Sequence, residues 1–394
     1  MSIFLWIIGI IVGLMAGGWV IRALGQTINL PSKQANNYFR DMPYLASVGI
    51  ALGILAIAVV IYFYFIAPTP FFVWAVNGFI FFAICAFLFR LLGRSLGTEG
   101  TKKLFRQMPL TAAFGILVII VYAITSIFAG FIAPYGQEEV FAKANLLPGG
   151  DVATGGDPAH ILGTDQIGRD ILSRIIYGAQ NTVGIAFVTT CLAFLIGTSM
   201  GFLAAIKGGW IDQLTSRIVD ALMAIPQLIF ALLLMTIATA WAGSNGFLVT
   251  VYMVLIIAVL DSTRVFRLSR AVGLNIVVMD YIEAAKLRGE TLSYLVFKEI
   301  LPNAFAPLLA EFGLRFCFVF LTIASLSFLG IGIQPPLADW GTMVKDLAAF
   351  INFAQFSPLT AALPLMAAGA IALLTVGVNF VVDWMLQKTS GLKE

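Results

Sequence analysis

Residues 110–132 read LTAAFGILVIIVYAITSIFAGFI and contain no charged side chain. A helix needs about 20 mostly apolar residues to cross a bilayer, so this segment predicts a membrane-spanning helix. The whole chain has the same character: 60% of its 394 residues are hydrophobic and 11% are charged, whereas soluble domains carry about 25% charged residues. This composition excludes a soluble enzyme, a disordered protein and a nucleic-acid-binding protein. It predicts an all-α, polytopic transmembrane helix bundle.

Nine segments have the length and hydropathy of a spanning helix. Pro68 and Pro70 separate the second from the third, which favours a hairpin over one long helix. The first segment lacks a basic flank and exceeds the length of a signal-peptide core, so we expect an uncleaved anchor. The nine segments are Ser2–Ala23, Pro43–Ala67, Phe71–Phe89, Leu110–Ile132, Thr182–Ile206, Ile218–Trp241, Phe247–Leu260, Ala304–Ile331 and Leu359–Leu386.

The positions of Lys and Arg predict how the chain is oriented, because short cytoplasmic loops are enriched in both. Alternate connecting segments hold 18 of the 23 basic residues, and the opposite set holds four. We therefore expect nine spans with the N-terminus outside and the C-terminus inside. The basic segments are Arg22–Asp41, Arg90–Arg106, Lys207–Arg217, Arg264–Lys298 and the C-terminal tail.

The segment Arg264–Asn303 is too charged to span a bilayer and too apolar to be only a solvated loop. Asp280 and Glu283 have the spacing of a capping box, with Asp280 as the N-cap. Gly289 follows two basic residues, as a glycine does at a helix C-terminus. These signals predict a short helix on the cytoplasmic face.

A second short helix is predicted from Thr291, its N-cap, to Ile300, with a bend at Pro302 into the next span. In the first helix, the small side chains of Ala284 and Ala285 permit close approach by a partner. From these residues alone, two interpretations stay open: a docking surface, or a helical loop that packs only on its own bundle.

The strings Glu283-Ala284-Ala285, Gly289 and Leu301-Pro302 match, at the family spacing, the EAA motif of ABC importer permeases. The segment resembles the coupling helix of those proteins, which docks in a groove of the ATPase subunit. Glu299 and Glu290 depart from the usual pattern. The resemblance implies an ATPase-coupling loop at 264–303 whose residues are Asp280, Glu283, Ala284, Ala285, Gly289, Leu301 and Pro302.

A long external segment ends in HILGTDQIGRD over residues 160–170. Gly163 and Gly168 bracket a tight turn, and Asp165 can accept hydrogen bonds from nearby amides in an Asx-turn. From Asp170 onward, an apolar stripe predicts an amphipathic helix that lies along the membrane interface and leads into the next span. A structural scaffold and a direct part in substrate passage both stay open for this motif.

The external string closely resembles the dipeptide/oligopeptide branch of ABC importer permeases, in particular the C-type subunit. The resemblance covers Leu110–Gln387 and implies a type I ABC importer permease fold with six spans in residues 101–394. Residues 1–100 lie outside it and would form an extension of three spans. The family residues in the external motif are His160, Gly163, Thr164, Asp165, Gly168, Arg169 and Asp170. The motifs that follow are Ala324–Gly330, Gln334-Pro335-Pro336, Trp340-Gly341, Pro364, Asn379 and Asp383.

One expected span carries Glu311 and Arg315, an i,i+4 pair on one helical face. Because a charge in mid-bilayer costs about 2.5–3.5 kcal/mol on insertion scales, such residues normally pair inside the protein. The pair is therefore either a buried structural ion pair or a polar lining of the translocation path. Many members of the family carry a glutamate where this chain has Ile323.

The chain contains no Gly-x-x-x-x-Gly-Lys-Ser/Thr string, so we expect no phosphate cradle, and His160 is its only histidine. We expect no metal site and no enzyme activity. The resemblance implies a permease subunit of an ATP-driven importer in the bacterial inner membrane that moves peptides or similar small solutes by alternating access. Its implied partners are a second permease of the B type, two ATPase subunits that bind ATP and Mg²⁺, an external substrate-binding protein and membrane lipid, with no nucleic acid.

Two other function classes fit the sequence less well. A secondary transporter or channel would need a relay of intramembrane acids, for which only Glu311, Asp261 and Asp383 qualify. A membrane-embedded enzyme would need a nucleophile clustered with a base, or metal ligands at one depth, and one external histidine does not provide them.

Overall fold

The computed structural model describes residue 50 and residues 70–95 and 99–390. The chain divides into two compact units, Met1–Ile80 and Phe81–Glu394, and each is considered by itself. The expected spans Ser2–Ala23 and Pro43–Ala67 lie outside the described residues except for Ile50. The expected boundary between a three-span extension and the six-span core stays a prediction.

The described residues confirm the all-α fold, since they form helices and no β-strand beyond two isolated bridges. The long helices are α4 (Pro70–Ser95), α6 (Leu110–Ile127), α9 (Gly184–Lys207), α12 (Gly246–Val277), α15 (Leu301–Phe328) and α17 (Pro358–Ser390). The shorter helices are α5 (Glu99–Gln107), α7 (Ala129–Ile132), α8 (Ile171–Gly178), α10 (Gly209–Met223), α11 (Gln227–Ala242), α13 (Asp280–Leu287), α14 (Leu292–Tyr294) and α16 (Trp340–Leu347). Single-turn or irregular helices complete the set: η2 (Val152–Thr154), η3 (Ala179–Val183), η4 (Leu295–Ile300) and η5 (Ala348–Phe353).

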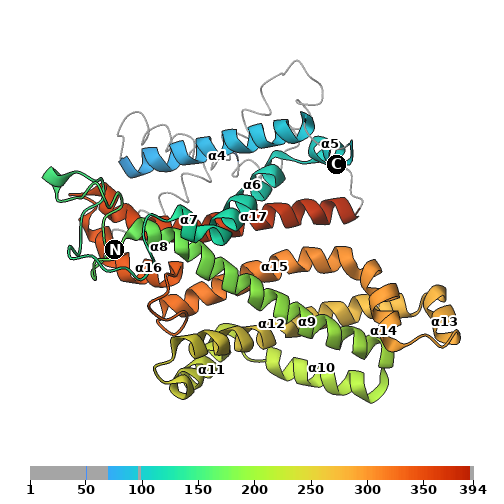
Figure 1. The fold of residues 1–394 in the computed structure, drawn as a ribbon. Coiled ribbons are helices and arrows are strands. Elements are labelled where there is room, and N and C mark those ends of the chain that lie inside the picture. Colours follow the sequence, from blue (N-terminus) through green and yellow to red (C-terminus); the bar gives the residue numbers. More distant parts are fainter. Residues whose placement is uncertain (1–49, 51–69, 96–98, 391–394) are drawn as a thin grey trace. The chain divides into compact units, whose positions relative to one another are not determined.

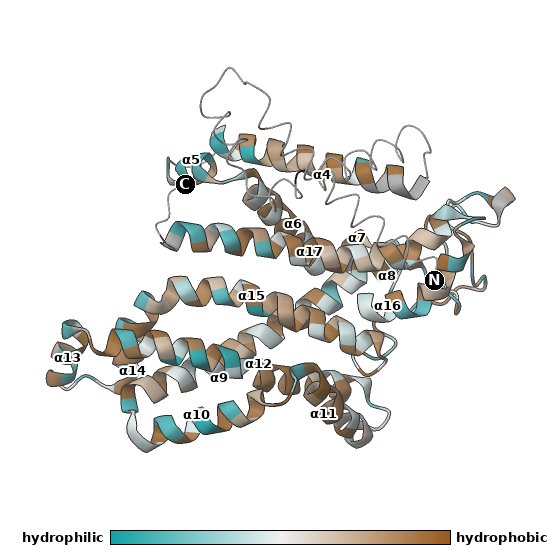
Figure 2. Cartoon of the chain, turned by 180° about the vertical axis from the view of Figure 1, so that it is seen from behind, coloured by the Kyte–Doolittle hydropathy of each residue, from teal (hydrophilic) through white to brown (hydrophobic). Residues whose placement is uncertain are grey.

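Six helical segments in the described part are long and apolar enough to cross a membrane. In the second unit, α9 packs along α12, and α17 packs along both α6 and α15 (Figure 1). Hydrophilic residues gather on α13, on α10 and near the C-terminal end of α17, whereas the middle of the bundle is hydrophobic (Figure 2). The six segments are Val76–Ser95, Leu110–Ile127, Ile171–Lys207, Gly246–Val277, Leu292–Phe328 and Pro358–Lys388.

The expected span Ile218–Trp241 is not a single helix but is broken in the middle. Helix α10 ends at Met223, α11 begins at Gln227, and the two meet at 88°. The break falls at Pro226, which has no N–H to donate and disfavours helical geometry in the residue before it. If α10 and α11 are counted as one broken span, the described part contains seven spans. This number equals that of the expected segments from Phe71–Phe89 to Leu359–Leu386.

Glycines let α9 and α12 approach closely, as small residues commonly do between membrane helices. A Cβ atom added at Gly201 of α9 would lie 2.7 Å from the Ser269 Cβ and 2.8 Å from the Phe266 carbonyl oxygen of α12. One added at Gly197 would lie 2.6 Å from the Ser262 carbonyl oxygen. Any side chain at these positions therefore forces the two helices apart.

We expect Gly201→Ala to destabilise the folded chain by about 1–3 kcal/mol, because overpacking against backbone cannot be relieved by a rotamer change. Gly184→Ala on the same helix is the matched control, since its added Cβ would meet only the Ser126 Oγ at 3.9 Å. Thermal unfolding of both variants in detergent checks this. Equal melting temperatures for the two variants would contradict close packing at Gly201.

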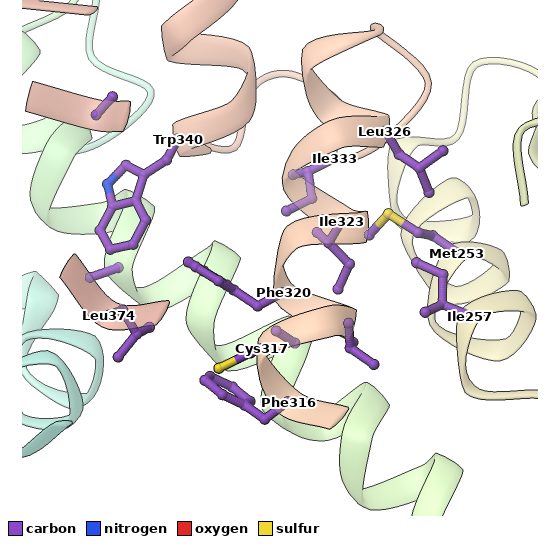
Figure 3. Packing of buried hydrophobic residues seen from close by; sticks show 14 of the residues in the cluster. Met253, Ile257, Phe316, Cys317, Phe320, Ile323, Leu326, Ile333, Trp340 and Leu374 are labelled. Carbon is purple, nitrogen blue, oxygen red and sulfur yellow. The ribbon is translucent and has the colours of Figure 1, made fainter. Parts of the chain in front are cut away.

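The main hydrophobic core lies between α12, α15, α16 and α17 (Figure 3). Phe320 of α15 is fully buried and meets the ring of Trp340 edge-on, with the centroids 6.3 Å apart. Met253 and Ile257 of α12 are also fully buried in this cluster. A second core, around Phe202, Ile282 and Ile300, lies under the segment that carries the expected coupling helix.

Candidate functional site

The predicted short helix at the EAA motif is α13, and it lies on the second core through two of its side chains. Ile282 and Ala285 are fully buried in that core. Glu283 and Ala284 are exposed, and Leu287 is 83% exposed. The motif therefore divides into a buried residue that anchors the helix and exposed residues that leave a face open for a partner.

The predicted capping box at Asp280 is wrong. The N-cap is Met279, no side chain caps the helix, and Asp280 is its first residue. Both Asp280 and Glu283 still lie in the first turn, where the positive end of the helix dipole favours an acidic side chain.

The end of α13 follows the prediction. Gly289 has φ 78°, a left-handed conformation that glycine adopts without steric cost. Its N–H donates to the Lys286 carbonyl at 3.0 Å, and the Glu290 N–H donates to the Ala285 carbonyl at 3.2 Å. The Thr291 hydroxyl then accepts from the Tyr294 N–H at 3.3 Å, which confirms Thr291 as the N-cap of the next helix.

The expected bend at Pro302 is wrong, because α14, η4 and α15 form one continuous helix over Leu292–Phe328. Leu301 and Pro302 are the first two residues of α15. A proline is tolerated in the first turn of a helix. Here Pro302 lies directly after the π-helical turn η4.

The external motif forms a hydrogen-bonded cap at the opposite end of the bundle. His160 Nδ1 lies 2.9 Å from Asp170 Oδ1. Asp170 Oδ2 accepts from the Ser173 N–H at 2.8 Å, which makes Asp170 the N-cap of α8. Tyr135 and Phe141 pack against the imidazole at ring-centroid distances of 5.0 and 4.6 Å.

The predicted Asx-turn at Asp165 is confirmed. Its Oδ1 accepts from the N–H groups of Ile167 at 3.0 Å and Arg169 at 2.9 Å, and its Oδ2 accepts from Arg169 Nε at 2.7 Å. Gly163 and Gly168 both have positive φ, and a side chain at either would strike a main-chain oxygen. The fully buried Thr164 donates to the Lys143 carbonyl at 2.9 Å. The motif therefore holds the loop 133–170 in one conformation.

The expected amphipathic helix is α8, and it continues into a spanning segment over Ile171–Lys207. Its Arg174 is buried, with Nη1 donating to the Gln137 carbonyl at 3.3 Å and Nε 3.9 Å from Asp165. Asp165 thus faces two guanidinium groups, Arg169 and Arg174, within a mostly buried cluster.

A polar junction that the sequence does not predict lies between the start of α16 and the π-helical turn η3 before α9. Asp339 is fully buried, and its carboxylate accepts from the Thr182 hydroxyl at 2.9 Å and from the Thr342 N–H at 2.8 Å. Trp340 Nε1 donates to the Ile175 carbonyl at 2.9 Å. The signal available in the sequence was Asp339 three residues before Thr342, an N-cap spacing, but nothing local points to Thr182.

Burial raises the pKa of Asp339 above its ordinary value of 3.8, although hydrogen bonds from Thr342, Thr182 and Ser327 lower it in part. A raised folded-state pKa means that the folded state prefers the protonated carboxyl, so stability is lost as the pH rises from 3.8 through the folded-state pKa. We expect Asp339→Asn to gain stability relative to wild type over that window. Melting temperatures of both proteins from pH 4 to pH 8 measure the difference, and a difference that is constant with pH would contradict the prediction.

The expected pair Glu311 and Arg315 exists, with Arg315 Nε 2.6 Å from Glu311 Oε1. The sequence does not predict that Asp261 of α12 also belongs to this pair. Asp261 is fully buried, and its Oδ1 lies 3.9 Å from Arg315 Nη1. Gln227, the first residue of α11, donates from Nε2 to Asp261 Oδ2 at 2.6 Å. We call Gln227, Asp261, Glu311 and Arg315 the intramembrane cluster.

The intramembrane cluster is incompletely satisfied. Asp261 Oδ1 and Arg315 Nη1 are buried and have no hydrogen-bond partner among the described residues. Glu311 is the most accessible of the three charged members, with 21% of its side chain exposed. A cavity of about 110 Å³ lies at the break between α10 and α11, with Pro226, Gln227 and Arg264 in its lining. Non-helical backbone at membrane depth is tolerated where it lines such a cavity or is buried in protein.

In the described part of the chain, no group of three or more His, Cys, Asp or Glu side chains could hold a metal ion. What these sites can do follows from their geometry. The face of α13 can bind a partner, the external cap fixes a loop, and the intramembrane cluster ties α11, α12 and α15 together through charge.

These features define a multi-pass helical membrane protein. Residues 167–390 match the family model described as the inner membrane component of binding-protein-dependent transport systems. The chain belongs to this family, and it is the permease type of subunit found in ABC importers. The match begins after His160–Gln166, so the start of the external motif lies outside it.

Three relatives show how close the similarity is. The chain is 36% identical over 245 residues to the dipeptide transport system permease protein of Haemophilus influenzae, covering 62% of this chain and 80% of the relative. It is 33% identical over 238 residues to the di/tripeptide transport system permease protein of Pseudomonas aeruginosa, covering 60% and 76%. It is 32% identical over 248 residues to the glutathione transport system permease protein of Pectobacterium atrosepticum, covering 63% and 77%.

Proposed function

We propose that this chain is the C-type permease of an ATP-driven importer for short peptides and works by alternating access. The observation that supports it most directly is α13, a short helix anchored by Ile282 and Ala285 with Glu283, Ala284 and Leu287 open to a partner. The names of the relatives favour peptides as the cargo: one transports dipeptides, one di- and tripeptides, and one the tripeptide glutathione.

The energy comes from two separate ATPase subunits, which hold the ATP and Mg²⁺. A second permease of the B type forms the other wall of the pathway, and an external protein delivers the peptide. Closure of the ATPases on nucleotide pushes the exposed face of α13. Its buried face moves the second core, and the continuous helix Leu292–Phe328 carries the motion across the membrane, so the pathway switches its open side.

The proposed orientation has the N-terminus outside and the C-terminus inside. It places α13, α10 and the end of α17 at the cytoplasmic face, where Figure 2 has hydrophilic residues. The external motif then faces the side on which a binding protein would arrive, and its internally satisfied hydrogen bonds favour a scaffold over a mobile substrate contact.

We assign the intramembrane cluster a structural role. Asp261 is fully buried and Arg315 nearly so, which places their charges inside the bundle instead of on a peptide path. Asp261 accepts from α11 and faces the arginine of α15, so the cluster holds three helices in register. Glu311, which is partly exposed, is the one charged member that could also touch cargo.

Peptide cargo is tested by uptake in cells that lack this chain and in cells that carry it on a plasmid. The probe is a radiolabelled dialanine, with unlabelled dipeptide, tripeptide and free alanine as competitors. The proposal expects uptake only in complemented cells, with competition by the peptides and not by alanine. Equal uptake in both strains, or competition by alanine alone, would reject peptide as the substrate class.

A further inference from the structure

Basic side chains gather at one end of the second unit, where α4 ends, α5 lies and α17 ends. We call these side chains the basic patch. Two acidic residues, Glu99 and Asp383, lie on the same helices. The cations of the basic patch are Arg90, Arg94, Lys102, Lys103, Arg106 and Lys388.

Helix α5 is held firmly in place on α4. The rings of Phe89 and Phe105 meet edge-on with their centroids 5.4 Å apart, and a side chain at Gly93 would strike the Phe105 ring. Arg94 Nε donates to the Phe105 carbonyl at 3.4 Å. Phe105 packs on the small cluster around Met108 that also includes Trp384 of α17. The three helix ends therefore present their charges together.

Most of these cations have no protein counter-ion. The patch contains one ion pair among the described residues, Lys102 with Glu99 at 3.3 Å, and Glu99 is 93% exposed. Lys103 and Arg106 are exposed and form no ion pair with any described residue. Arg90 Nε is buried without a hydrogen-bond partner in the described part of the chain.

The depth of the patch is set by its neighbours. The apolar stretch of α4 ends at Ser95 and that of α6 begins at Leu110, so α5 lies where both leave the bilayer. Trp384, under Lys388 at 5.6 Å, is of the type enriched at this level. Beside the cations, Leu88, Leu91 and Leu92 of α4 are each about half exposed. The cations can bind a lipid headgroup while the exposed leucines contact its acyl chains. A soluble anion would contact the cations alone.

We propose that the basic patch binds the phosphate of an anionic phospholipid, with the acyl chains along α4. Juxtamembrane Lys and Arg clusters and basic pockets between helix ends attract such headgroups. In the orientation proposed above, the lipid belongs to the cytoplasmic leaflet. The lipid site involves neither the cargo nor ATPase coupling. A failed test of lipid binding would therefore leave the proposed function unchanged, and the reverse also holds.

The test is native mass spectrometry of the full-length chain in detergent with phosphatidylglycerol or phosphatidylcholine of identical acyl chains. Lys103→Gln with Arg106→Gln removes two exposed, unpaired charges and is expected to lower the phosphatidylglycerol affinity by about tenfold or more. Lys207→Gln with Arg217→Gln is the matched control, because these residues are also one exposed Lys and one exposed Arg without an ion pair among the described residues. We expect the control to stay within about twofold of wild type.

A second variant tests the geometry with every charge retained. Gly93→Ala pushes against the Phe105 ring and displaces α5, so it should also weaken phosphatidylglycerol binding while phosphatidylcholine binding is unchanged. The proposal is overturned if the control pair loses as much affinity as the patch pair, if neither patch variant loses any, or if free inorganic phosphate displaces the lipid. Gel filtration of each variant shows that the affinities refer to folded protein.

Discussion

Ala284→Arg is expected to abolish ATP-driven uptake while the chain remains folded in the membrane. Ala284 is exposed on α13 beside Glu283, so a long cation there does not disturb the second core, which rests on Ile282 and Ala285. If the face of α13 lies in a partner's groove, the added side chain prevents docking. The loss of a central contact in an interface is typically at least 2 kcal/mol, or about 30-fold.

Two comparison variants separate docking from folding. Ala284→Ser keeps the side chain small and should retain uptake. Ala285→Arg places a cation at a fully buried position and should lower the amount of folded protein itself. Uptake and membrane protein level are measured for all three. Normal uptake by Ala284→Arg at normal protein level would remove α13 as the coupling surface.

The second large effect is expected at Arg315, where replacement by Gln leaves the buried Asp261 without its facing charge. Breaking a buried charge pair by removing one partner costs about 3–5 kcal/mol. The double variant Asp261→Asn with Arg315→Gln removes both charges and should recover most of that loss. Arg217→Gln is the control, because Arg217 is exposed and forms no ion pair among the described residues.

Melting temperatures in detergent, together with uptake, distinguish the two roles of the intramembrane cluster. A structural role predicts that the double variant regains both stability and uptake. A role in the path predicts regained stability with uptake still lost, and Glu311→Gln alone should then impair uptake. A double variant as unstable as Arg315→Gln would contradict the inferred coupling between Asp261 and Arg315.

Features that depend on neighbouring residues were predictable from the sequence. The apolar length of Leu110–Ile132 predicted α6, and Asp165 with its flanking glycines predicted the Asx-turn, since each signal lies within a few positions of its consequence. The errors at Asp280 and Pro302 have the same local origin. Asp280 fits both an N-cap and the first turn of a helix, and Pro302 fits both a bend and the first turn, so neighbouring residues do not decide between the two.

Features that depend on distant residues were not predictable. Thr182 and Asp339 are 157 positions apart, and Gln227 and Asp261 belong to separate helices. Mean hydropathy alone predicts one span over Ile218–Trp241, because a single proline hardly changes that mean. Pro226 nevertheless breaks the helix. The division of the EAA motif into a buried anchor and an exposed face also required the packing partners of Ala285.

We propose above that an ATPase provided by another chain drives this permease through α13. The most direct measurement is site-specific cross-linking from a cysteine placed at Leu287 of α13, which is 83% exposed, in membranes of the producing bacterium. The account predicts a cross-linked partner that hydrolyses ATP, and a cross-link yield that changes when ATP is added. A partner without ATPase activity, or no cross-link at Leu287 while uptake proceeds normally, would contradict it.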